Sequence, residues 1–300
     1  MEIKKIIIWG NKLHTHTHSY IHGAFFKAFK HLGYETYWFD DNNFPNDFDF
    51  ENSFFLSHSD YLKKMPINNS SFYFLHNVEK KYHEKIPIER KLFFQVYTTD
   101  CIGRDTPNIE RPFHYFTQSA DQNIIYFPWA SDLLPEEIEE NIKNLEHIKT
   151  SKNIYFVGSR TDAWDKFSRI CRKNRIRFLK REGISFEENK KLIQESIISP
   201  AIQFKWQIEK EYIPCRIFKN ISYGKMGITN SEGVQRLFNG KLIYDSDLNN
   251  ILKKGLEFEK REDKNKIIED LMSEVKEKHT YLNRIEYIKW YMEKYMNITM

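Results

Sequence analysis

Two short segments in the second half of the chain carry residues suited to binding phosphate. Gly158-Ser159-Arg160 follows an apolar run and precedes a helical pattern. Free N–H groups at a helix start attract phosphate, glycine permits its close approach, and arginine adds a permanent positive charge. Arg216 lies near another predicted helix start, where a cation opposes the helix dipole unless an anion binds beside it. An ordinary turn, and a surface arginine paired with Glu209 or Glu211, are the alternatives.

Further polar residues gather between positions 199 and 231, where predicted strands end and predicted helices begin. In open α/β sheets, ligands bind at this edge. The additional candidates for contact with a bound nucleotide are Gln203, Lys205, Phe218, Lys219, Thr229, Asn230 and Ser231.

A histidine-rich loop follows the first apolar run of the chain. His14, His16 and His18 alternate, but alternate positions of an extended chain lie about 6–7 Å apart, too far for imidazoles to converge on zinc without a bend. We therefore expect no metal site. At the ligand-facing edge of a sheet, His16 or His18 can act as a base towards an acceptor hydroxyl. Asp100, after a predicted strand, is a second candidate base. The alternative for each histidine is a place in a solvated loop, and the alternative for Asp100 is a helix cap.

These residues need a scaffold of buried strands and flanking helices. Residues 4–9 form a predicted strand that is continuously apolar from Ile6 to Trp9, residues 21–32 show helical spacing, and residues 34–39 resume as a strand. This β-α-β opening is typical of a parallel sheet. Further strands of the first domain are expected at 53–56, 71–75, 92–97, 114–117 and 124–127.

The second half repeats this alternation, so the sequence predicts two α/β domains in tandem. The predicted domains are residues 1–145 and 146–280, because an acidic helix and a polar hinge lie between 128 and 151. Ser185 and Glu188 form a predicted capping box, and Pro214 suits the first turn of a helix ending at Gly224. Expected strands are 153–157, 176–179, 226–229 and 242–245, and expected helices are 162–173, 185–196, 247–256, 264–278 and 281–296.

Composition limits the class of partner. The 46 Lys and Arg residues nearly balance the 42 Asp and Glu residues, for a net charge of +4, so we expect no nucleic-acid partner. The basic run 169–181 fits a membrane surface or an acidic partner, with a solvated helix face as the alternative. Three widely spaced cysteines and a short N-terminal apolar run indicate a cytoplasmic protein.

Several motifs together resemble the C-terminal half of GT-B glycosyltransferases, most closely the spore-maturation and spore-envelope branch. The resemblance extends from Asn153 to Arg284. The motifs are Phe156-Val157-Gly158-Ser159, Arg216-Ile217-Phe218-Lys219 with Gly224, Thr229-Asn230, Asp245 to Leu248, and Lys278-His279-Thr280-Tyr281 with Arg284.

The resemblance implies two Rossmann-like domains facing a cleft, with the nucleotide-sugar donor in the C-terminal domain and the acceptor in the N-terminal one. Residues 281–300 would form a helix crossing back to the first domain. Gly158 and Ser159 would contact the diphosphate. Two glutamates of related retaining enzymes, which contact the sugar and the ribose, fall on Glu211 and Lys219. A lysine cannot accept hydrogen bonds from ribose hydroxyls, so stereochemical retention or inversion stays open.

The sequence thus predicts a glycosyltransferase of glycan biosynthesis that moves a hexosyl or related group from a nucleoside-diphosphate sugar to a hydroxyl of a glycan, lipid-linked or protein acceptor. No cofactor or metal is expected, because basic side chains and helix N-termini can stabilise the departing diphosphate. A sugar-nucleotide epimerase of the same fold and a non-catalytic nucleotide- or nucleic-acid-binding module are the alternatives.

Overall fold

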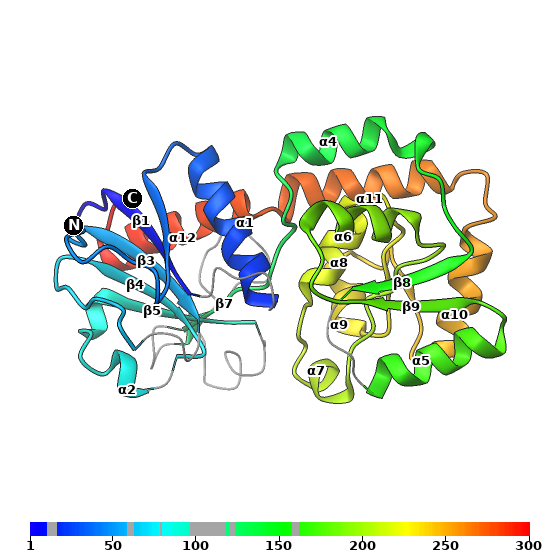
Figure 1. The fold of residues 1–300 in the computed structure, drawn as a ribbon, viewed down its shortest axis with the longest axis horizontal. Coiled ribbons are helices and arrows are strands. Elements are labelled where there is room, and N and C mark those ends of the chain that lie inside the picture. The colour runs from blue at the N-terminus through cyan, green and yellow to red at the C-terminus, as the bar shows by residue number, and fades with distance from the viewer. Residues whose placement is uncertain (11–16, 59–62, 79, 97–117, 120–123, 158–161) are drawn as a thin grey trace. The chain divides into compact units, whose positions relative to one another are not determined.

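The computed structural model describes residues 1–10, 17–58, 63–78, 80–96, 118–119, 124–157 and 162–300, with the backbone alone at Thr17, His18, Gln118, Ser119 and Asp162. Its contacts divide the chain into two compact units (Figure 1). Unit 1 comprises Met1–Pro128 and Tyr281–Met300, and unit 2 comprises Trp129–Thr280. The strand expected at 114–117 lies outside the described residues.

Unit 1 contains a sheet with the strand order β2-β1-β3-β4-β5-β7-β6. The first six strands in this order pair in parallel, and β6 pairs antiparallel with β7. The direction in which successive strands are added to the sheet reverses at β1, because β2 lies on one side of it and β3 on the other. Open sheets bind ligands at such a switch point. The strands are β1 (Lys5–Trp9), β2 (Thr36–Phe39), β3 (Ser53–His58), β4 (Phe72–His76), β5 (Lys91–Gln95), β6 (Gln118–Ser119) and β7 (Ile124–Tyr126).

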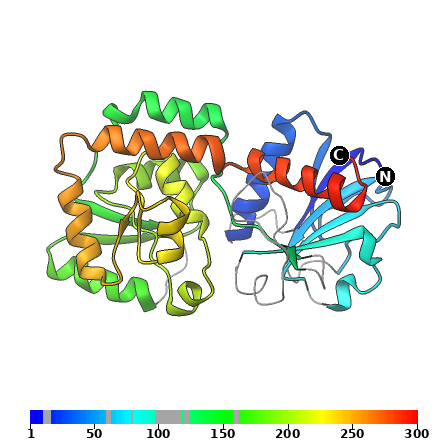
Figure 2. The same ribbon diagram turned by 180° about the vertical axis from the view of Figure 1, so that it is seen from behind.

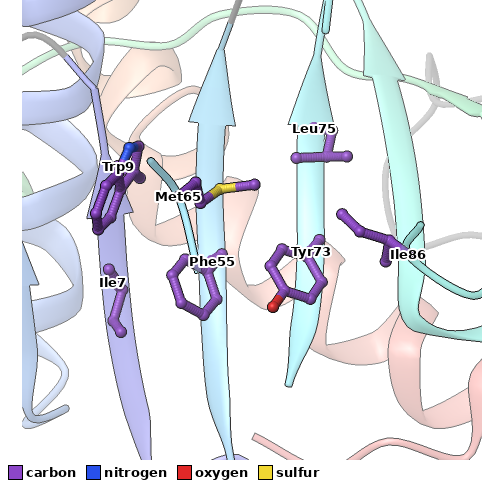
Figure 3. Close-up of a cluster of buried hydrophobic side chains, with 7 residues drawn as sticks. All are labelled: Ile7, Trp9, Phe55, Met65, Tyr73, Leu75 and Ile86. Atoms are coloured by element: carbon purple, nitrogen blue, oxygen red, sulfur yellow. The ribbon is translucent and has the colours of Figure 1, made fainter. Parts of the chain in front are cut away.

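Both faces of this sheet are apolar, as continuous apolar strands require. α1 (Thr17–His31) and α12 (Tyr281–Met296) pack together on one face, where the rings of Phe25 and Tyr281 lie 4.4 Å apart (Figure 2). The opposite face holds a second buried cluster (Figure 3), formed by Ile7, Trp9, Phe55, Met65, Tyr73, Leu75 and Ile86. The short helices of this unit are α2 (Lys80–His83) and the 3-10 turn η1 (Ile88–Arg90).

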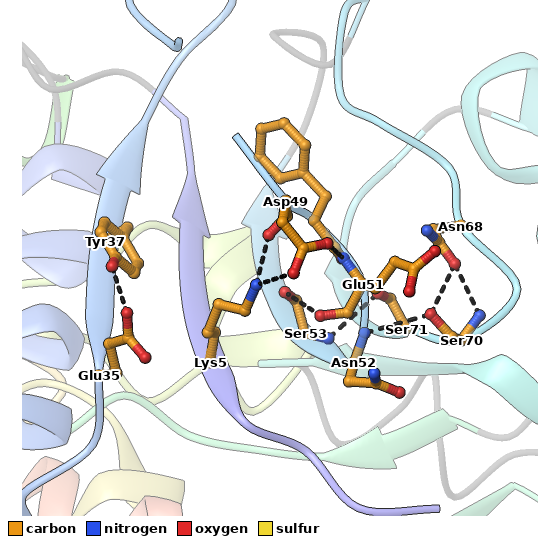
Figure 4. Close-up of polar contacts among 11 residues, drawn as sticks. Lys5, Glu35, Tyr37, Asp49, Glu51, Asn52, Ser53, Asn68, Ser70 and Ser71 are labelled. Atoms are coloured by element: carbon orange, nitrogen blue, oxygen red, sulfur yellow. Dashed lines mark hydrogen bonds and ion pairs between the residues drawn. The ribbon is translucent and has the colours of Figure 1, made fainter. Parts of the chain in front are cut away.

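Local polar contacts gather near the amino-terminal ends of these strands (Figure 4). Lys5 Nζ donates to a carboxylate oxygen of Asp49 at 2.7 Å, and the amide of Ser53 donates to Ser71 Oγ at 3.1 Å. Tyr37 donates to the Glu35 carboxylate. These contacts satisfy groups at strand starts, whereas a ligand site is expected at the opposite edge.

Unit 2 is a second α/β layer structure with two parallel strand pairs. β8 (Asn153–Val157) pairs with β9 (Arg177–Arg181), and β10 (Ile228–Thr229) pairs with β11 (Ile243–Tyr244). Residues 197–201 connect the pairs, because Ile197 N donates to Asn153 O and Ala201 N donates to Ile228 O, both at 2.8 Å. The helical elements are α4 (Pro135–Lys143), η2 (Leu145–His147), α5 (Asp162–Lys173), α6 (Phe186–Glu195), α7 (Lys205–Glu209), α8 (Cys215–Ser222), α9 (Glu232–Leu237), α10 (Leu248–Phe258) and α11 (Lys264–Lys278).

Local sequence signals set two helix ends in this unit. Ser185 Oγ accepts the amide hydrogen of Glu188 at 3.1 Å, as the predicted capping box requires. Gly224 ends α8 at φ +89, and a Cβ there would lie 2.9 Å from the Ile148 side chain. Glycine therefore meets both a conformational and a packing need at this position.

The boundary between the units falls between Pro128 and Trp129 rather than at 145/146, because α4 packs within unit 2. Lys276 Nζ binds the Glu139 carboxylate at 2.6 Å, and Asn141 Nδ2 donates to Ser222 O at 2.9 Å. In unit 1, the fully buried Arg284 of α12 donates from Nε to Pro128 O at 2.8 Å. The acidic helix is thus part of the second core, and the last helix part of the first.

Candidate functional site

Arg216, the second residue of α8, is held against the end of β8. Its Cζ atom lies 4.4 Å from the ring centroid of Phe156 and 5.4 Å from that of Trp164. Its Nη2 donates to the carbonyl of Val157, the last residue of β8, at 2.8 Å. Cation–π contacts of this kind favour a fixed, desolvated guanidinium. The arginine is therefore anchored at the carboxyl end of the strand that precedes Gly158.

No carboxylate of the described residues forms an ion pair with Arg216. Glu211 is bound by Arg236, and Glu209 lies 3.7 Å from Lys205. The alternative in which Arg216 is a surface arginine paired with Glu209 or Glu211 is therefore excluded. A half-buried cation of this kind suits a bound anion.

Lys219 follows one turn later on α8. Burial lowers the pKa of its amine, which the nearby Asp132 carboxylate and Cys215 thiol partly oppose and Arg216 reinforces. Burial also lowers the pKa of Arg216. Residues three apart on a helix are neighbours, so two half-buried cations share one side of the first turns of α8.

The helix itself adds to this positive field. The N-cap residue of α8 is Pro214, and no side chain caps this end. Arg216 lies in the first turn of α8, so the partial positive charge of the helix N-terminus lies close to it. A helix N-terminus with two adjacent cations is a suitable site for a phosphate group.

Asp132 and Tyr223 form the inner wall of this cluster. Asp132 is 8% exposed, and Tyr223 donates its phenol hydrogen to a carboxylate oxygen at 2.5 Å. The two residues are 91 positions apart, so no local pattern in the sequence predicted the contact. The negative charge of the Asp132 carboxylate balances part of the positive charge of Lys219.

A second polar group lies at the carboxyl end of β10. Asn230 accepts from Gln203 N at 2.7 Å and donates to Gln203 O at 3.0 Å, while Gln203 Nε2 donates to Tyr212 O at 2.6 Å. Ser231 N donates to Thr229 Oγ1 at 3.1 Å. The structure thus brings Gln203, Thr229, Asn230 and Ser231 together, chiefly as buried groups that hold the backbone.

Three predicted site residues have other surroundings. Phe218 is fully buried against Phe238 and His279, with ring centroids 6.0 and 5.0 Å away, so it is a core residue rather than a nucleotide contact. It faces inward because it is two positions from Arg216 on a helix. The Lys205 side chain is 89% exposed. Glu211 has φ +51, and Arg236 occupies its carboxylate.

No model of a known protein family matches the chain, and no curated protein matches it in sequence. Among solved structures, an α-glucosyltransferase in complex with UDP and a 13-mer DNA containing a central A:G mismatch matches with a TM-score of 0.63 and 8% identity, over 98% of this chain and 99% of that one. The likeness, at this identity, concerns the fold alone. The chain has the GT-B fold.

Two other structures have the same general kind of fold. An α-glucosyltransferase with UDP and a 13-mer DNA containing an HMU base matches at a TM-score of 0.55 and 8% identity, over 97% of this chain and 99% of that one. A trehalose-6-phosphate synthase matches with a TM-score of 0.49 and 10% identity, over 92% of this chain and 77% of that one. The two α-glucosyltransferase structures support the fold alone, and the finer resemblance to the spore-maturation branch stays a prediction.

Several candidates on this GT-B chain lie outside the described residues. They are His16, Asp100, Gly158, Ser159 and Arg160. For His18, the backbone alone is described, as the second residue of α1. The predicted roles of these residues as base or diphosphate contact stay predictions.

A row of buried histidines lies at the carboxyl edge of the unit 1 sheet. His58 ends β3 and His76 ends β4, with ring centroids 5.1 Å apart, and the ring of His22 is 6.4 Å from that of His58. A Cβ on Gly10 would lie 2.5 Å from the His22 ring. The strand register that stacks His58 on His76 could not be inferred from their spacing along the chain.

His76 is neutral in this row. Its Nδ1–H donates to Phe94 O at 3.0 Å, and Asn77 Nδ2 donates to its Nε2 at 3.1 Å. Burial lowers the pKa of His76 to about 4. This imidazole is accordingly a structural hydrogen-bonding group.

No cluster of three or more His, Cys, Asp or Glu residues suited to a metal ion occurs within the described residues. The chain has two Asp-x-Asp sequences, Asp47-Phe48-Asp49 and Asp245-Ser246-Asp247. Their carboxylates make structural contacts: Asp49 binds Lys5, Asp245 binds Lys254 at 2.8 Å, and Asp247 caps α10. Within the same part of the chain, no helix combines the length and apolar character needed to cross a bilayer.

Proposed function

We propose that this chain is a glycosyltransferase that moves a sugar from a nucleoside-diphosphate sugar to an acceptor hydroxyl, and that unit 2 binds the diphosphate. The observation that carries the proposal is the pair of half-buried cations, Arg216 and Lys219, in the first turns of α8, whose start has no side-chain cap. The GT-B fold supports it, and the two neighbours with TM-scores above 0.5 are described as complexes with UDP.

In the proposed reaction, the bond between the anomeric carbon and the diphosphate oxygen breaks, and its electron pair leaves with the nucleoside diphosphate. The acceptor oxygen forms the new bond to the anomeric carbon, and its proton passes to a base, for which His16, His18 and Asp100 are the candidates. Arg216 and Lys219 stabilise the charge that grows on the diphosphate. These groups supply positive charge without requiring a metal ion.

Donor recognition departs from the retaining pattern at Lys219, which replaces an acceptor of ribose hydroxyl hydrogens. Glu211 keeps the pattern, and one oxygen of its carboxylate binds Arg236. We therefore assign diphosphate binding to Lys219 and leave the anomeric outcome open. Glycans, lipid-linked sugars and proteins are the acceptors we expect. DNA, present in both neighbours, belongs among the acceptors to test.

Isothermal titration with UDP and GDP tests the donor site. Arg216→Met keeps an apolar chain over Phe156 but removes the charge, and we expect it to weaken binding about 10- to 150-fold, the equivalent of about 1.5–3 kcal/mol. Arg216→Lys should recover part of the affinity. Arg261→Met is the matched control, because Arg261 also lies near a ring and pairs with Asp263 on the surface. Equal affinities of the wild type and Arg216→Met would remove Arg216 from the site.

Transfer is distinguished from epimerisation by omitting the acceptor. An epimerase would convert the nucleotide sugar alone into an isomer, whereas a transferase needs an acceptor for rapid release of the nucleoside diphosphate. Chromatography of the nucleotide sugars after incubation checks this. Accumulation of an epimer without acceptor would contradict the proposal.

A further inference from the structure

A dense run of positive charge lies in unit 2, away from the residues assigned to the donor. Seven of the 13 residues from 169 to 181 are basic, and none is acidic. We call these seven residues the basic strip: Arg169, Arg172, Lys173, Arg175, Arg177, Lys180 and Arg181. Without them, the chain has 39 basic and 42 acidic residues. The near-neutral total charge therefore hides a strongly positive region.

The basic strip follows the last turns of α5, the turn after it, and β9. β9 pairs with β8 alone among the described strands, so it is an edge strand. All members of the strip are exposed except Lys180, which is half-buried. The opposite side of α5 is apolar, since Trp164, Phe167 and Cys171 are buried. The cations thus face outward from a well-packed helix.

Within the described residues, the only ion pair of the strip joins Lys180 to Glu182 at 2.6 Å. Elsewhere in unit 2, several exposed lysines have acidic partners; for example, Lys254 binds Asp245 at 2.8 Å, and Lys266 lies 3.1 Å from Asp270. Protection of an edge strand by charge explains cations on β9. The helix dipole favours Arg172 and Lys173 in the last turn of α5, but neither effect accounts for Arg169 and Arg175, which bring the count of basic residues there to four.

Arg175 lies at a position that favours glycine. Its φ is +58, and Ile176 N donates to Cys171 O at 2.9 Å while Arg175 N donates to Arg172 O at 3.0 Å. This is a Schellman motif with arginine at the left-handed residue. The left-handed backbone makes any side chain costly at this position. An arginine kept where glycine fits better suggests a role in binding.

We infer that the basic strip binds nucleic acid through its phosphates. Five of the seven residues are arginines, whose planar fork makes bidentate contacts with phosphate. β9 is about 13 Å long, enough for about four phosphates of one strand. No large apolar side chain is exposed between 163 and 182, which disfavours a surface that inserts into a membrane. This inference does not depend on the proposed sugar transfer.

Fluorescence anisotropy with a fluorescein-labelled DNA duplex of about 20 base pairs tests the inference. If about five phosphates are contacted, the wild-type affinity should fall several hundred-fold between roughly 50 and 200 mM KCl. Arg172→Gln combined with Arg177→Gln should weaken binding about 10-fold or more and reduce the slope of log K against log salt by about 2. The two-charge control is Lys143→Gln with Lys260→Gln, on exposed residues outside the strip, which should leave both quantities unchanged.

Arg175→Gly separates binding from stability. Glycine suits the backbone at this position, so the Tm of the variant should be unchanged or higher. Its affinity for DNA should fall by a factor of about 3 or more. No binding at about 50 mM KCl, equal losses in the strip and control variants, or unchanged affinity of Arg175→Gly would overturn the inference. Tighter binding to phosphatidylserine vesicles than to DNA would also overturn it. All of these measurements omit the sugar donor, so they stand or fall separately from the proposed transferase activity.

Discussion

Phe156 and Arg216 form a cation–π pair at the carboxyl end of β8, with the guanidinium carbon 4.4 Å from the ring centroid. The two residues are 60 positions apart. Phe156 is buried by Trp164 and Phe178, with ring centroids 4.0 and 6.0 Å away. The aromatic core of unit 2 therefore supports the cation that we assign to the diphosphate.

Phe156→Leu should weaken UDP binding about 3- to 10-fold, because the guanidinium loses its ring. The free energy of unfolding should fall by about 1–1.5 kcal/mol. Phe178→Leu is the control: this ring touches the same aromatic cluster, so stability should fall similarly while UDP affinity is retained. Calorimetry and urea unfolding measure the two effects. Equal losses of UDP affinity in both variants would contradict a specific role for the Phe156 ring.

Lys219→Met should weaken UDP binding about 10-fold through loss of one cation. Lys219→Glu should weaken it further, because the new carboxylate would face both the diphosphate and the nearby Asp132. Titrations with UDP and 2′-deoxy-UDP check this. Tighter binding of UDP by Lys219→Glu, with selectivity against the deoxy analogue, would show that this position contacts the ribose instead.

Acid should destabilise unit 1 through His76. Its pKa is about 4 in the folded protein, against 6.5 ordinarily, so between these values the unfolded chain binds more protons. Above about pH 6.5, His76 does not lower the free energy of unfolding. As the pH decreases to 4, this free energy falls by about 3 kcal/mol. Hydrogen exchange of β4 at several pH values measures this loss. The loss of stability should be smaller in His76→Phe than in the wild type. An identical pH dependence of the wild type and His76→Phe would assign the loss to other groups.

Asn230→Ala should reduce the free energy of unfolding by about 2–4 kcal/mol, since two backbone groups of Gln203 lose their partners. UDP binding should weaken as well if the end of β10 contributes to the site. Asn249→Ala removes an exposed amide and should cost less than about 0.5 kcal/mol. Urea unfolding compares the variants, and a similar small effect in both would mean that Gln203 finds other partners.

The sequence alone predicted most of the longer elements of this fold, but not the short helices α2, α7 and α9. The strand 153–157 and the helices 162–173, 264–278 and 281–296 have the bounds that the apolar periodicity indicates. The Ser185 cap is present at its predicted position. These features depend on neighbouring residues, so a single chain segment contains the information for them.

Tertiary structure decided how the site is assembled. Arg216 and Lys219 were chosen from the sequence, but the Val157 carbonyl and the Phe156 ring that hold Arg216 belong to the distant strand β8. Phe218, chosen for the same reasons, faces the core.

The buried Asp132, its contact with Tyr223 and the stacking of His58 on His76 had no signal in the sequence pattern. The boundary of unit 2 likewise depended on the packing of α4. Hydrophobic periodicity reports which face of an element is buried, but not which distant element covers it. Contacts between residues far apart in the chain arise from chain reversal and packing, and these decide which polar side chains meet.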